Sequence, residues 1–196
     1  MKALPEKLEG QFVIALTNLR LAALSADFLL EAMRAGVKDL PTQLVMKGPR
    51  RSVRLPSTNC GFFVTPVIHS ALLDVRRTLE FFLLRLDKAK GEFVTAQAKK
   101  YPDDFAITDL GLAPVDPVSL LGLSISVIGG APTKCLIEAL TYTNKDMAHF
   151  SEKQNQPDLQ GVIDSTKVIH EAILVFVYDA LGIARPNPQP TVHEEE

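Results

Sequence analysis

The residues best suited to chemistry lie between Thr143 and His149, near the predicted end of a helix. Helical spacing would place Lys145 one turn before His149, with Asn144 beside it. A neutral imidazole can accept or release a proton near neutral pH, and a lysine ammonium can stabilise a phosphate. This pattern makes His149, Asn144 and Lys145 candidate catalytic residues for a phosphate-bearing substrate.

The segment 144–149 resembles the motif of the HEPN superfamily of helical bundles (higher eukaryotes and prokaryotes nucleotide-binding), many of whose members are metal-independent RNases. The family motif is an Arg, often followed by Asn or Asp, and then a His a few residues later. Here the Lys-x-x-Ala-His pattern of Lys145 to His149 resembles abortive-infection-type members. Thr143 or Asn144 stands where the motif has Arg, so the resemblance implies a degenerate RNase site at the two-fold interface of a homodimer. Lys145 is a candidate substitute for the missing cation.

A purely structural interpretation of the same residues stays open. A histidine near a helix C-terminus interacts favourably with the helix dipole, which would explain His149 without any reaction. Asn144 and Lys145 would then be part of a solvated surface.

Four basic residues make up a second candidate site for phosphate or nucleic acid: Lys47, Arg50, Arg51 and Arg54. They lie in a stretch, residues 40–73, that contains no acidic residue, although the whole chain carries a net charge of -2. This stretch is suited to phosphate, RNA or an acidic partner. The alternative is a solvated basic loop.

No metal site or cofactor is predicted. The two cysteines, Cys60 and Cys135, form no CxxC pair, and Cys135 is expected in the core. A di-metal bundle site would need Glu-x-x-His pairs, and no Glu lies three residues before His69, His149 or His170.

Composition indicates an ordinary globular domain of 196 residues, with 46% apolar and 22% charged residues. Two isolated cysteines are typical of a reducing compartment, and early acids such as Glu6 argue against a secretory signal. The uncharged stretch 117–133 is shorter than a membrane span. We therefore expect a cytoplasmic protein with no membrane association.

Apolar residues at alternating steps of three and four predict an all-α, HEPN-like bundle of four long amphipathic helices plus one or two short ones. The expected helices span 5–36, 65–91 (with Thr65 as N-cap and Pro66 in the first turn), 132–150 and 159–181. No convincing set of strands is evident, and residues 119–128 fit either a strand or, as we favour, a short helix. A single domain is expected over 1–184, followed by a disordered Pro- and Glu-rich tail over 185–196.

Two further functions remain open beside RNA binding. The apolar runs Phe81 to Leu84 and Ala172 to Tyr178 are suited to the interface of a non-catalytic, dimeric interaction protein as well as to a core. A pocket between helices would instead indicate a small-ligand-binding bundle, although no residue selects the ligand.

Overall fold

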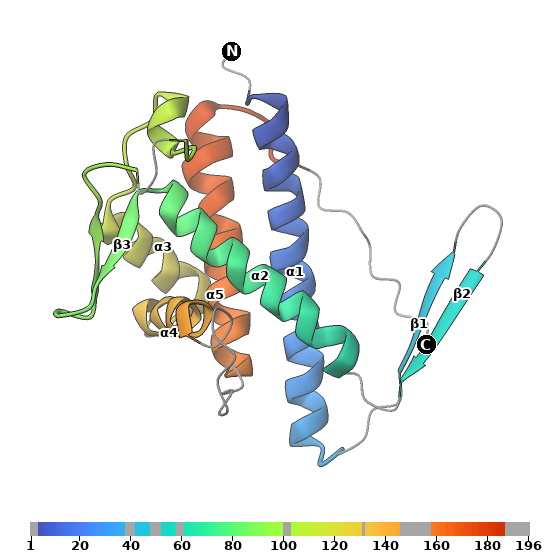
Figure 1. Ribbon diagram of the computed structural model, residues 1–196. Helices are drawn as coiled ribbons and strands as arrows, with labels where there is room; N and C mark the ends of the chain where they lie inside the picture. Colours follow the sequence, from blue (N-terminus) through green and yellow to red (C-terminus); the bar gives the residue numbers. More distant parts are fainter. Residues whose placement is uncertain are drawn as a thin grey trace.

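The computed structural model describes residues 4–37, 42–47, 52–57, 61–99, 103–130, 132–145 and 158–186, and this part of the chain is mostly helical (Figure 1). The helices are α1 (Glu6–Arg34), α2 (Gly61–Phe81), α3 (Pro117–Ile128), α4 (Pro132–Lys145) and α5 (Leu159–Ile173). A 3₁₀ turn, η1, covers Ile107–Leu110, and a π-helical segment, η2 (Leu174–Asp179), continues α5. The strands are β1 (Thr42–Lys47), β2 (Ser52–Ser57), β3 (Leu84–Asp87) and β4 (Glu92–Thr95).

The core is built around α5, which packs against α1, α2, α3 and α4. Figure 1 shows α1 on one side of α5, α3 and α4 on the other, and α2 crossing the bundle. Large, fully buried side chains of four helices meet there, among them Leu19, Leu72, Leu136 and Ile169. Their burial supplies the main driving force for folding, because apolar surface is removed from water.

Helix α1 confirms the predicted apolar stripe from Phe12 to Ala26, whose members are buried. The stripe ends earlier than expected, since Met33 is 66% exposed. The opposite side of α1 is also apolar, which the periodicity alone did not indicate. By length and composition α1 also qualifies as a membrane-crossing helix, as a core helix can, and 28% of its most apolar window is buried.

Helix α2 begins at Gly61, so the prediction of Thr65 as its N-cap is wrong. Pro66 lies inside the helix rather than at its first position. Its ring nitrogen has no hydrogen to donate, so the carbonyl of residue 62, four residues earlier, receives no helical hydrogen bond from it.

The same helix ends at Phe81, so the prediction that it continues to Gly91 is also wrong. Leu83 has a φ of 60°, a left-handed conformation that a helix cannot contain. The chain then forms the antiparallel β3–β4 hairpin, with Leu86 opposite Phe93. At its turn the Gly91 amide donates to the Asp87 carbonyl at 2.8 Å, and Gly91 adopts a φ of 67° that glycine tolerates best.

We also expected no convincing set of strands, and this prediction is wrong, since β3 pairs with β4 and β1 pairs with β2. Residues 119–128 are helical, as favoured, within α3. Helix α4 begins at Pro132 as predicted, and residues 146–150 of the expected helix lie outside the described residues.

Helix α5 also begins as predicted, where the Asp158 carboxylate accepts a hydrogen bond from the Gly161 amide at 3.0 Å. Arg185, the first residue of the predicted tail, is paired with Glu171 of α5 and with Asp179 of η2. Residues 187–196 of that tail lie outside the described part of the chain.

The two apolar runs that suited a dimer interface as well as a core, Phe81 to Leu84 and Ala172 to Tyr178, belong to the core. Phe81, Phe82, Leu83 and Leu84 are all buried, and so are most residues from Ala172 to Tyr178. The Phe82 ring packs edge-on against Phe176, with centroids 5.8 Å apart. A dimer interface, if formed, has to use another surface.

Candidate functional site

The predicted motif lies at the C-terminal end of α4. Asn144 and Lys145 are the last two residues of this helix, while His149 lies outside the described residues. The structure therefore positions the backbone of two of the three candidates and gives no geometry for the third.

The predicted basic patch coincides with the β1–β2 hairpin. Lys47 is the last residue of β1 and Arg54 lies in β2, whereas Arg50 and Arg51 lie outside the described residues. The register pairs Lys47 with Ser52 and Val45 with Arg54. Lys47 and Arg54 are thus two ladder positions apart.

A polar contact joins α2 and α4 immediately before the motif. The Nε2 atom of His69 lies 2.9 Å from the Tyr142 hydroxyl oxygen, which is a hydrogen-bonding distance. Partial burial lowers the pKa of His69 below its ordinary value, so the neutral imidazole dominates at neutral pH. Thr143, the next residue, is 1% exposed. These contacts fix the helix turn from which Asn144 and Lys145 follow.

A cleft of about 670 Å³ lies between α2, the β3–β4 hairpin and α4; we call it the basic cleft. Three cations line it, Arg76 on α2 with Arg85 and Lys88 on the hairpin, against one carboxylate, Glu80. The Arg76 Nε atom lies 3.3 Å from Glu80 Oε1, so this pair compensates itself. Arg85 and Lys88, both exposed, give the cleft its excess positive charge.

The floor of the basic cleft is apolar and includes Leu79, Leu84 and, from α4, Ile137 and Leu140. Thr141 completes the wall that α4 contributes. Positions 144 and 145 follow Thr141 by three and four residues on the same helix. The helix that forms this wall of the cleft therefore ends at the motif positions.

The basic cleft thus brings three cations to a cleft that α4 also lines. Arg76, Arg85 and Lys88 were not among the predicted site residues, because a helix through residue 91 would place the last two on a solvated helical face. No sequence signal marks them, since their approach to α4 depends on the turn after Phe81.

Other chemistry finds little support in the described residues. Burial raises the pKa of the Cys135 thiol to about 12, which disfavours the reactive thiolate. Within the described ranges, no three His, Cys, Asp or Glu side chains gather as a metal site would require. No family model, curated protein or solved structure matches the chain.

Proposed function

We propose that this chain is a HEPN-like helical protein that binds RNA in the cytoplasm, as a homodimer with a degenerate, metal-independent RNase site at Asn144, Lys145 and His149. One observation carries the proposal: the cations of the basic cleft share that cleft with Ile137, Leu140 and Thr141 of α4, the helix whose last residues are Asn144 and Lys145. The predicted patch of Lys47, Arg50, Arg51 and Arg54 would contact further phosphates.

The residue types fit single-stranded RNA. Arginine and lysine neutralise backbone phosphates, and Arg85 has the planar fork that binds phosphate oxygens in pairs. The apolar floor of the cleft offers a dry surface to bases splayed out of a helix. At the motif, His149 would move a proton at the attacking 2′-hydroxyl or the leaving oxygen, while nearby cations stabilise the phosphate charge.

Charge reversal tests the RNA-binding surface. In the double variant Arg85→Glu/Lys88→Glu, we expect affinity for a labelled single-stranded RNA to fall at least about tenfold in a fluorescence anisotropy titration at low salt. The matched control Lys7→Glu/Arg34→Glu makes the same charge change at two exposed positions of α1. Equal loss in both variants, or no RNA binding by the unmodified protein, would contradict the proposal.

Catalysis needs its own assay. We expect slow RNA cleavage that persists when EDTA removes metal ions and that disappears in the variant His149→Ala. RNA binding without cleavage would leave the binding function and remove the enzyme.

A second candidate function is favoured by the outer face of α1, which we define as Val13, Ile14, Leu24 and Phe28. These side chains are 43%, 61%, 45% and 51% exposed, although all four are large and apolar. Exposed apolar patches often mark protein interaction sites. They support a non-catalytic, dimeric helical interaction protein.

Light scattering tests whether the outer face of α1 forms a dimer interface. Leu24→Glu/Phe28→Glu should convert a dimer to a monomer with little change in folding, because neither side chain belongs to the core. A double change of the same kind on α3, Val118→Glu/Ile125→Glu, is the control, since both residues are also exposed. An unmodified protein that is monomeric at micromolar concentrations would refute this candidate.

A further inference from the structure

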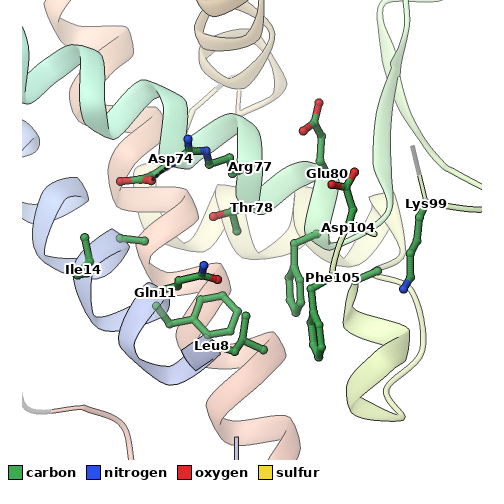
Figure 2. A pocket seen from close by; sticks show the side chains of 14 residues that line it. Leu8, Gln11, Ile14, Asp74, Arg77, Thr78, Glu80, Lys99, Asp104 and Phe105 are labelled. Atoms are coloured by element: carbon green, nitrogen blue, oxygen red, sulfur yellow. Dashed lines mark ion pairs between the residues drawn. The ribbon is translucent and has the colours of Figure 1, made fainter. Parts of the chain in front are cut away.

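A second cleft lies on the other edge of α2, between α1, α2, residue 99 and residues 104–106 (Figure 2). Its volume is about 560 Å³, within the range of pockets that hold small organic molecules. We call this cleft the Asp74 cleft, because the buried side chain of Asp74 lines it.

Aromatic side chains form much of the wall. Phe12 of α1 and Phe81 of α2 are buried, and their rings pack edge-on with centroids 5.2 Å apart. Phe105 is 43% exposed and lies beside the opening, as Figure 2 shows. A ligand with an apolar body would therefore remove further apolar surface from water.

The Asp74 carboxylate is the buried charge of this cleft. Asp74 is 9% exposed, and its Oδ2 accepts a hydrogen bond from Asn18 Nδ2 at 2.9 Å. Its Oδ1 lies 3.8 Å from Arg77 Nη1, a long distance for an ion pair. Burial raises the pKa of this carboxyl, and the Asn18 hydrogen bond and the Arg77 charge only partly oppose the rise. The carboxylate is therefore incompletely compensated within the protein.

The cations that line the Asp74 cleft, Arg77 and Lys99, compensate the charge of the Asp74 carboxylate poorly. The Arg77 side chain is 75% exposed, so water screens its charge at the rim. Lys99 is held 2.7 Å from Asp109 Oδ2, which matches its charge outside the cleft. Glu80 and Asp104 also line the cleft, and Glu80 is already paired with Arg76. A positively charged guest would therefore compensate the buried Asp74 carboxylate better than the exposed Arg77 does.

We propose that the Asp74 cleft binds a small organic cation, in which an ammonium or guanidinium group pairs with Asp74 and an apolar body rests against Phe12, Phe81 and Phe105. A charge-assisted hydrogen bond to a buried carboxylate is about twice as strong as a neutral one. Aromatic side chains add attraction for cations that approach their faces. The guest would replace the weak contact with Arg77 and leave the Asn18 hydrogen bond in place.

Three probes of similar shape and different charge test this inference: benzylammonium, benzyl alcohol and benzoate. We expect benzylammonium to bind in the millimolar range or tighter, and at least about tenfold more tightly than benzyl alcohol, in an NMR titration. Benzoate should bind more weakly than either. Benzoate binding as tightly as benzylammonium, or no binding of the cation up to about 20 mM, would overturn the proposal.

Variants assign the binding to this cleft. Asp74→Asn keeps the shape of the side chain and should remove the preference for benzylammonium over benzyl alcohol. Phe105→Ala changes an exposed side chain and should weaken both probes alike. Asp27→Asn, on an exposed part of α1, should change neither. A preference that survives in Asp74→Asn would overturn the assignment. The RNA-binding assay is independent of this outcome, since the probes address the opposite edge of α2.

Discussion

The basic cleft and the Asp74 cleft lie on two edges of the same helix and have opposite electrostatic character. Arg76 lines the first and its neighbour Arg77 lines the second, because consecutive residues of an α-helix point about 100° apart. Glu80 lines both. The difference comes from the partners: the β3–β4 hairpin brings cations to one edge, whereas α1 encloses a carboxylate at the other. The charge of each cleft thus depends on the elements that pack against α2 as well as on the residues of α2 itself.

The largest expected effect comes from the core that holds both clefts. Phe82 is fully buried, and its chain neighbours Phe81 and Leu83 line the two clefts, so Phe82→Ala should cost about 3–5 kcal/mol of unfolding free energy and weaken both binding activities together. Urea unfolding measures the loss. Val118→Ala, at a position that is 71% exposed, should change stability by less than about 0.5 kcal/mol. A Phe82→Ala protein of nearly normal stability would show that the clefts do not share this core.

A smaller and more selective effect should separate the two neighbouring arginines. Arg76→Ala should weaken RNA binding several-fold, because it removes a cation and leaves Glu80 without this partner, and it should not weaken benzylammonium binding. Arg77→Ala should do the reverse: RNA binding stays, and benzylammonium binds more tightly because a competitor for Asp74 is gone. Anisotropy and NMR titrations of both variants measure this. Two variants with the same behaviour toward both ligands would break the distinction between the clefts.

The smallest effect concerns the pH dependence of stability. A carboxyl whose pKa is raised on folding stabilises the protein fully below its unfolded pKa, and this contribution is lost as pH rises through the folded pKa. Asp74 is such a group. Asp74→Asn should therefore gain stability relative to the unmodified protein as the pH rises from about 4 toward neutral. Urea midpoints across this range measure the difference. The opposite trend would mean that Asn18 and Arg77 outweigh burial.

The sequence alone predicted the helical character of the chain and much of its core. The stripe of α1 and the N-cap of α5 could be predicted because both are local: one is a periodicity and the other a single capping residue. The end of α2 could not, since the apolar run from Phe81 to Leu86 satisfies a helix and a buried strand equally well. Only the left-handed backbone of Leu83 decides between them.

The two clefts could not be predicted from the sequence either, because both depend on residues that are distant in the sequence. Asp74 and Asn18 are 56 residues apart and meet only because α1 packs against α2. Arg85 and Lys88 reach the α4 side only through the hairpin. By contrast, the helical position of Asn144 and Lys145 was predictable from the run that begins at Pro132. His149, Arg50 and Arg51 fall outside the described residues, so their role stays a prediction.

The most direct measurement of the central claim is a map of amide NMR shifts on titration with a short single-stranded RNA. The account predicts shifts at Arg76, Arg85 and Lys88 and along α4 from Thr141 to Lys145, with the amides around Asp74 and Phe105 unmoved. Shifts confined to the Asp74 cleft or to α1, or no shifts at RNA concentrations that saturate binding, would contradict it.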